Sequence, residues 1–237
     1  VADGTASVDD AMLRIKEGPL QSYKDMGFAR PDLHRGLRQG VPEVIYGAGK
    51  TPQQIADISA ALLENGQRTV IITRMNREAA EFAGASLRER FGLIAAGTEE
   101  SGKWAAEAYG QNVFAYDELS GIGIAGKMPL PSDVGNIVVA TAGTSDMPVA
   151  EEAAKTAEAL GNRVTRLYDV GVAGIHRLMA QMDTLMSAKV IIAIAGMEGA
   201  LASVIGGMAD CPVIAVPTSV GYGASFNGLA ALLSMLN

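Results

Sequence analysis

The strongest constraint on the fold is a regular alternation of short apolar segments with amphipathic helical segments in the second half of the chain. Strands are expected at residues 137–141, 164–168, 190–195 and 213–216, and helices at residues 149–160, 175–182, 198–208 and 227–236. Strands that alternate with helices pair in parallel, because each helix must cross the sheet before the next strand begins. The sequence therefore predicts an α/β fold with a doubly wound parallel sheet. The last helix reaches Asn237 with no capping glycine or polar tail, as expected of a chain that continues further.

The first 130 residues predict a smaller α/β domain. In chain order we expect a weakly helical stretch at residues 8–26 that Gly18-Pro19 interrupts, a strand at 44–47, a helix from the Thr51 cap to Gly66, a strand at 69–73 and a helix at 77–90. This order indicates a small parallel sheet. Residues 98–133 are less regular, so we place a boundary near residues 128–133, between a domain at 1–130 and a domain at 131–237.

Composition and charge exclude several classes of protein. Hydrophobic residues make up 49% of the chain and charged residues 19%, which allows a sizeable buried core. The net charge of −7 argues against a nucleic acid or an anionic membrane as partner, because phosphate binding needs clustered Lys and Arg. No apolar run approaches the roughly 18 residues of a membrane span. The single cysteine, Cys211, cannot form an intramolecular disulfide and fits a reducing, cytoplasmic compartment.

Four loops follow the carboxyl ends of the expected strands, where doubly wound sheets bind their ligands. In the first loop, the backbone amides and hydroxyl groups of residues 143–145 suit a phosphate, and Asp146 is placed to accept a hydrogen bond from a ligand hydroxyl. The alternative is that Ser145 and Asp146 only cap the helix that follows. The fourth loop, residues 217–223, is again small and hydroxyl-rich, and it includes Ser219. Together the loops predict a ligand site at this edge of the sheet.

The second and third loops carry titratable side chains. The second loop begins at Asp169 and contains His176, a candidate proton donor, and Arg177, a candidate clamp for an anionic group. In the third loop, Gly196-Met197 leaves room for a ligand, and Glu198 is a candidate carboxylate in the crevice. Each has a simpler alternative, with His176 as a surface or capping residue and Glu198 as a first-turn carboxylate favoured by the helix dipole.

Cys211 precedes the strand expected at residues 213–216, so it should lie at the amino edge of the sheet, opposite the four loops. On composition alone it is a buried, inert thiol. The alternative is a nucleophile, which would need the loops of another subunit to reach it.

The loop motifs together are specific. They are GTSDMPVAEEA at residues 143–153, DVGVAGIHR at 169–177, AGMEGA at 195–200 and VPTSVGYG at 216–223, with RPDLHR at 30–35, PEVIYG at 42–47 and GKT at 49–51 in the first half. Across nearly the whole chain this set resembles the LarB family of nickel-pincer cofactor biosynthesis proteins. Over the second half alone, the chain also resembles the aminoimidazole ribonucleotide carboxylase/mutase family, which implies a flavodoxin-like sheet.

The LarB resemblance implies that the chain carboxylates the pyridinium ring of nicotinic acid adenine dinucleotide with CO2 and cleaves its phosphoanhydride. The products would be pyridinium-3,5-biscarboxylic acid mononucleotide and AMP, in the first step of making the nickel-pincer cofactor used in lactate racemase maturation. The implied mechanism passes through a cysteine adduct on the ring. The catalytic residues implied are Cys211, Asp146, His176 and Glu198, and the substrate-binding residues are Gly143, Thr144, Ser145, Asp169, Arg177, Gly196, Met197 and Ser219.

The resemblance implies no organic cofactor, because the substrate ring is its own activatable carbon. Magnesium is a candidate for the anhydride step, although no spaced cluster of His, Cys or Asp marks a metal site. The family also implies a homo-octamer, which would bring loops of a neighbour to Cys211. Two other functions stay open, an aminoimidazole ribonucleotide carboxylase/mutase and a protein that binds nucleotides without chemistry.

Overall fold

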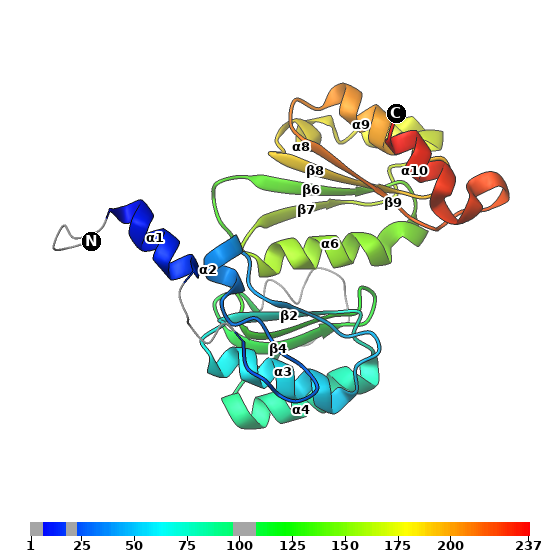
Figure 1. Ribbon diagram of the computed structural model, residues 1–237. Coiled ribbons are helices and arrows are strands. Elements are labelled where there is room, and N and C mark those ends of the chain that lie inside the picture. Colours follow the sequence, from blue (N-terminus) through cyan, green and yellow to red (C-terminus); the bar gives the residue numbers. More distant parts are fainter. Residues whose placement is uncertain (1–6, 18–22, 97–107) are drawn as a thin grey trace.

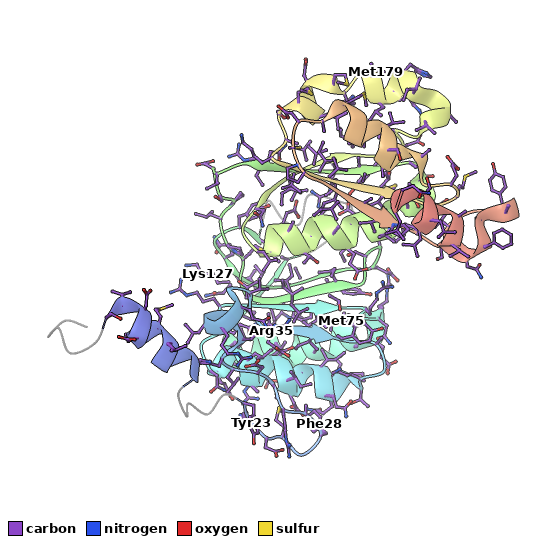
Figure 2. All side chains as sticks on the ribbon, turned by 45° about the horizontal axis from the view of Figure 1, so that its top comes forward. Tyr23, Phe28, Arg35, Met75, Lys127 and Met179 are labelled. Atoms are coloured by element: carbon purple, nitrogen blue, oxygen red, sulfur yellow. The ribbon has the colours of Figure 1, made fainter. Side chains whose placement is uncertain are left out.

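Two β-sheets lie on either side of helix α6 (Met147–Ala159) in the computed structural model of the chain (Figure 1). The structure describes residues 7–17, 23–96 and 108–237. Side chains fill the layers between α6 and the two sheets (Figure 2), and α6 contacts strands of both. In these described ranges, no helix has both the length and the apolar character needed to cross a membrane.

The second sheet has four parallel strands, as predicted. They are β6 (Asn136–Thr141), β7 (Arg163–Leu167), β8 (Val190–Ala195) and β9 (Val213–Pro217). Their order is β7-β6-β8-β9, the flavodoxin-like order in which the direction of winding reverses at β6. Val138 of β6 pairs with Thr165 on one side and with Ile191 on the other, and it is fully buried. This burial fits a strand covered by helices on both faces.

The helices of this half cover both faces of the second sheet. Helix α6 lies on the face toward the first sheet, while α9 (Ala200–Met208) and α10 (Leu229–Met235) lie on the other face (Figure 1). The single helix expected at residues 175–182 is wrong, because the chain forms two short helices, α7 (Ile175–Met179) and α8 (Met182–Met186). Gln181 lies between them with φ −109° and ψ 17°, outside the helical region.

The last helix begins later than expected. Phe226 and Asn227 have φ values of +46° and +55°, in the left-handed region, so they cannot belong to a right-handed helix. The segment Gly223–Gly228 (η3) is instead two tight turns joined at a kink that contains Phe226 and Asn227, and α10 starts at Leu229.

The first sheet is mixed: the two strands expected there, at residues 44–47 and 69–73, pair in parallel as predicted, but the sheet as a whole is not parallel. Its strands are β1 (Val44–Tyr46), β2 (Thr69–Thr73), β3 (Ile94–Ala96), β4 (Asn112–Asp117) and β5 (Ile122–Lys127), in the order β1-β2-β5-β4-β3. Strands β1 and β2 are parallel, as are β3 and β4, but β5 runs antiparallel to both of its neighbours. The β4–β5 hairpin lies in the region that the sequence pattern left irregular.

Glycine explains why β5 escaped prediction. Glycine is depleted in strands and often marks a close approach of backbones. At Gly126 a Cβ atom would lie 2.3 Å from the carbonyl oxygen of Arg68, so only glycine fits there. The hairpin turn also joins the start of α4, because the N–H of Met75 (labelled in Figure 2) donates to the Gly121 carbonyl at 2.9 Å.

Helices α3 (Pro52–Glu64) and α4 (Arg77–Phe91) cover the face of the first sheet that points away from α6 (Figure 1). Helix α3 begins with the predicted Thr51 cap, where Thr51 and Gln54 form a reciprocal capping box. Two further helices, α1 (Val8–Glu17) and α2 (Arg35–Gln39), precede this sheet. The expected helix at residues 8–26 is confirmed over α1 and is wrong over residues 23–26, where Tyr23 forms an isolated antiparallel β-bridge with Asp32. Residues 18–22 lie outside the described part.

Candidate active site

A cavity of about 450 Å³ lies at the carboxyl edge of the second sheet. All four strand-end loops contribute to it, as the sequence predicts. Its lining residues are Ala142, Gly143, Ser145, Asp146, Gly171, Val172, Ala173, Arg177, Ala195, Gly196, Met197, Glu198, Leu201, Val220, Gly221 and Tyr222. Most of these side chains are small or apolar, which suits a flat ring, while Asp146, Glu198 and Arg177 supply charge.

Asp146 is the buried carboxylate of the cavity, with 3% of its surface exposed. Its Oδ1 accepts a hydrogen bond of 2.7 Å from the hydroxyl of Thr218, and its Oδ2 accepts one of 3.1 Å from the N–H of Gly143. The Asp146 side chain makes no capping hydrogen bond to α6. The carboxylate therefore ties the β6 loop to the β9 loop. The simpler interpretation of Asp146 as the cap of α6 is wrong, although its bond to the Gly143 N–H caps the short 3₁₀ turn η1 (Thr144–Asp146) that precedes α6.

The loop after β8 passes very close to the loop after β9. The N–H of Met197 donates to the Val220 carbonyl at 2.8 Å. A Cβ atom at Gly196 would lie 1.9 Å from that same oxygen and 2.7 Å from the hydroxyl oxygen of Thr218. Glycine at this position therefore lets the two loops form one wall, with the exposed Glu198 at its rim.

The loop after β7 brings Arg177 into the cavity. Asp169 has φ +58°, and its N–H donates to the hydroxyl of Thr141 at 3.1 Å. Its carboxylate forms an ion pair with the guanidinium of Arg177. Asp169 does not line the cavity itself but holds Arg177, and both side chains are partly exposed.

Seven of the predicted residues meet in the cavity and five do not. Those in the lining are Gly143, Ser145, Asp146, Arg177, Gly196, Met197 and Glu198. Thr144, His176 and Ser219 are exposed and outside the lining, and Asp169 reaches it only through Arg177.

Cys211 lies outside the cavity, at the amino end of β9, as its place in the sequence predicts. The strand's five residues separate it from the loop that lines the cavity, a span of roughly 16 Å. Its half-buried side chain packs against the core of the second sheet. Within one chain, therefore, the Cys211 thiol does not reach the cavity.

Sequence reasoning missed two residues of the fourth loop, Thr218 and Tyr222. The hydroxyl-rich motif at residues 216–223 indicates the loop and includes the predicted Ser219, but it does not indicate which hydroxyl turns toward Asp146. Neighbouring side chains in an extended segment point in opposite directions, so Thr218 turns inward to Asp146 while Ser219 faces solvent. Tyr222 lines the cavity with 80% of its surface exposed.

The donor set does not favour a resident metal ion. In the part of the chain that the structure describes, no three His, Cys, Asp or Glu side chains gather closely enough to hold one. The cavity's own carboxylates, Asp146 and Glu198, lie in different loops, and both oxygens of Asp146 already accept hydrogen bonds.

Comparisons with known proteins divide the chain into two matched regions. Residues 23–91 match the family model of a LarB/PurE-like N-terminal domain, and residues 136–237 match that of AIR carboxylase. The second match includes the whole of the second sheet and all four cavity loops. An uncharacterized protein of Methanocaldococcus jannaschii is 35% identical over 233 residues, which cover 98% of this chain and 83% of that protein.

Proposed function

This chain belongs to the LarB family, with its LarB/PurE-like and AIR carboxylase domains, and from that membership we propose that it carboxylates the pyridinium ring of nicotinic acid adenine dinucleotide. The two domains make it a carboxylase-type enzyme. In the proposed reaction the dinucleotide, CO2 and water give pyridinium-3,5-biscarboxylic acid mononucleotide and AMP. This product is the starting point of a nickel-pincer nucleotide cofactor.

The observation that carries the proposal is a mostly apolar cavity with one buried carboxylate and one cation in its wall. A pyridinium ring is flat and cationic, so it suits apolar walls beside the negative charge of Asp146. Its carboxylate and phosphate groups are anionic and suit the guanidinium of Arg177. A volume of about 450 Å³ lies in the range of small-molecule sites.

The chemistry needs a nucleophile, because a cationic ring does not attack CO2. A thiolate that adds para to the ring nitrogen makes a neutral dihydropyridine, whose adjacent carbon is electron-rich. That carbon forms the new bond to CO2, then loses its proton to a base, and expulsion of the thiolate restores the aromatic ring. Glu198 at the rim is the base we assign, and Asp146 stabilises the cationic ring before and after the adduct. Hydrolysis of the anhydride releases AMP.

The source of the thiolate is the second part of the proposal. Cys211 lies at the far end of β9 from the cavity of its own chain. It can serve only if subunits assemble so that Cys211 of one copy meets the loops of another, as the homo-octamer implied by the family would allow. His176, which is exposed outside the lining, has no proton-transfer role in a cavity formed by one chain.

The test is to incubate the protein with nicotinic acid adenine dinucleotide, bicarbonate and magnesium and to follow products by mass spectrometry. Magnesium is added only to accompany the substrate's phosphates. We expect AMP and a mononucleotide that carries one carboxyl group more than nicotinic acid mononucleotide. A Cys211→Ala variant that loses all activity supports the assembled-subunit arrangement, whereas an equally active variant removes Cys211 from the mechanism and leaves the carboxylation in place.

The match of residues 136–237 to AIR carboxylase favours one second candidate, a carboxylase or mutase acting on aminoimidazole ribonucleotide. That reaction needs no thiol. The same assay with aminoimidazole ribonucleotide in place of the dinucleotide separates the two, since turnover of the imidazole substrate alone would replace our proposal. Binding of the dinucleotide with no product from either substrate would instead indicate a nucleotide-binding protein.

A further inference from the structure

Helix α6 carries a row of buried charges on one face. Glu151, Lys155 and Glu158 are spaced to lie on the same side of the helix, and each is at most 4% exposed. Acidic and basic side chains are almost never fully buried unless they are paired. Ala150 and Ala154, on another face of α6, pack against the apolar residues of the second sheet, so the charged face is a separate face of the helix.

The carboxylates of this face are held by β7 and the residue after it. Arg166 donates to both oxygens of Glu151 at 3.0 and 3.1 Å, and to both oxygens of Glu158 at 2.6 and 3.1 Å. The hydroxyl of Tyr168 donates to Glu151 at 2.6 Å. Burial alone would lower the pKa of Arg166, but the two carboxylates raise it above its ordinary value. The pairing therefore fixes α6 against the carboxyl end of β7.

The lysine of this face joins the second half of the chain to the first sheet. The Nζ of Lys155 lies 3.5 Å from a carboxylate oxygen of Glu151 and 3.6 Å from Oδ1 of Asp117, the last residue of β4. Asp117 is itself held in place, because its Oδ2 accepts hydrogen bonds from the hydroxyl and the N–H of Ser120, at 2.6 and 2.9 Å. The first sheet thus presents a fixed negative charge to the middle of α6.

Both ends of this network lead to the cavity. Helix α6 begins at Met147, directly after Asp146, so the axial position of the helix sets the position of that carboxylate. Tyr168 is followed directly by Asp169, which holds Arg177 in the cavity wall. The other end of α6, at Ala159, is packed in the core of the first sheet.

We propose that Asp117 and Lys155 are positioning residues, through which the first sheet holds α6 and thereby sets the geometry of Asp146 in the cavity. The expected loss of turnover rests on the proposed function, whereas the expected change in the position of α6 does not. It gives the N-terminal half a role in the reaction without contact with substrate. Because a misplacement of about 1 Å at a reacting group can lower turnover a hundredfold, a small shift of α6 is enough to matter.

The test compares Asp117→Asn with Glu118→Gln. Glu118 is the next residue, is exposed, and pairs with the exposed Arg77 rather than with Lys155, so it is a matched control. We expect Asp117→Asn to increase amide hydrogen exchange over residues 143–150, at the distant start of α6, and to lower kcat about tenfold with KM for the dinucleotide little changed. Glu118→Gln should change neither quantity.

A double variant separates positioning from a general loss of stability. Asp117→Asn removes one carboxylate that lies beside Lys155, whereas Asp117→Asn with Lys155→Met removes both members of that ion pair. Glu151 keeps its hydrogen bonds to Arg166 and Tyr168 in the double variant, and replacing a buried ion pair by neutral groups is often tolerated. We expect the double variant to recover both the protection of residues 143–150 and a kcat within about threefold of the wild type. It also keeps the test informative if Asp117→Asn alone does not fold.

Two outcomes would overturn the inference. One is increased exchange in Asp117→Asn confined to β4 and its turn, with residues 143–150 as protected as in the wild type. The other is a double variant as impaired as the sum of its single changes. Hydrogen exchange needs no substrate, so if the wild type does not turn over the dinucleotide, the proposed function fails while this experiment still decides the role of Asp117.

Discussion

The closest approach in the cavity wall is at Gly196, and adding one methyl group there tests the whole site. In Gly196→Ala the new Cβ would lie 1.9 Å from the carbonyl oxygen of Val220. An ordinary contact is about 3.4 Å, so the β9 loop would have to retreat by roughly 1.5 Å, the difference between these distances. The obstacle is backbone rather than a flexible side chain, so the clash cannot be relieved by a change of rotamer.

The retreat also breaks the hydrogen bonds that the β9 loop makes to the other loops of the cavity. Thr218 belongs to the same loop and would lose its 2.7 Å hydrogen bond to Asp146, while the Met197 N–H would lose its bond to Val220. A displacement of about 1 Å can lower turnover a hundredfold, so we expect Gly196→Ala to lower kcat/KM by at least about 100-fold. The measurement is steady-state carboxylation of the dinucleotide, with thermal unfolding recorded for the same samples.

Gly206→Ala is the matched control, since it makes the same chemical change in the same half of the chain. Gly206 lies within α9, and a Cβ there meets nothing within 4 Å. Alanine is favoured over glycine in helices, so this variant should keep full activity and gain about 0.5–1 kcal/mol in free energy of unfolding. A Gly196→Ala variant as active as Gly206→Ala would refute our description of the cavity wall.

Three further predictions concern hydrogen bonds to buried carboxylates. Thr218→Val removes the hydroxyl that holds Asp146, so it should lower the free energy of unfolding by about 2 kcal/mol and lower kcat at least tenfold. Denaturant titration and steady-state kinetics measure the two effects. Ser219→Ala, at the exposed neighbouring residue, should change neither quantity. Tyr168→Phe removes a donor to Glu151 from a half-buried site and should cost about 1.5 kcal/mol of unfolding free energy; no change in the denaturation midpoint would contradict the network. Burial acts to raise the pKa of Glu151, but the hydrogen bonds from the Arg166 guanidinium and the Tyr168 hydroxyl lower this pKa overall. The ionised Glu151 therefore stabilises the fold fully above the ordinary pKa of 4.5, and this stabilisation is lost as the pH falls through the lower pKa of the folded state. Acid unfolding of a Glu151→Gln variant should accordingly show a weaker pH dependence in that window than the wild type.

The second half of the fold followed from the sequence because every level of the pattern agreed. Apolar strands buried on both faces alternate with helices, and each connection is short, so one parallel topology satisfies them all. The first sheet did not follow, because β5 contains Gly123 and Gly126, whose lack of side chains is a packing requirement visible only in three dimensions. Likewise, no glycine or proline marks the break between α7 and α8 at Gln181.

The site was predictable at the level of loops and less so at the level of side chains. The topology of a parallel sheet places the loops after its strands at one edge, so the sequence predicts that Asp146, Arg177 and Glu198 lie near one another there, and all three line the cavity. Thr218 was not, because its role comes from a contact with Asp146 across 72 positions of sequence. The buried network around Glu151 and Lys155 was also missed, since charged residues in a helical pattern are normally taken as its solvent face.

The most direct test of the central claim is to follow the carbon of ¹³C-labelled bicarbonate during turnover of nicotinic acid adenine dinucleotide. Our account predicts one labelled carboxylate on the pyridinium ring for each AMP released, and loss of both products in Thr218→Val to the same degree. Release of AMP and nicotinic acid mononucleotide without label would show that the cavity only cleaves the anhydride, and would contradict the proposed carboxylation.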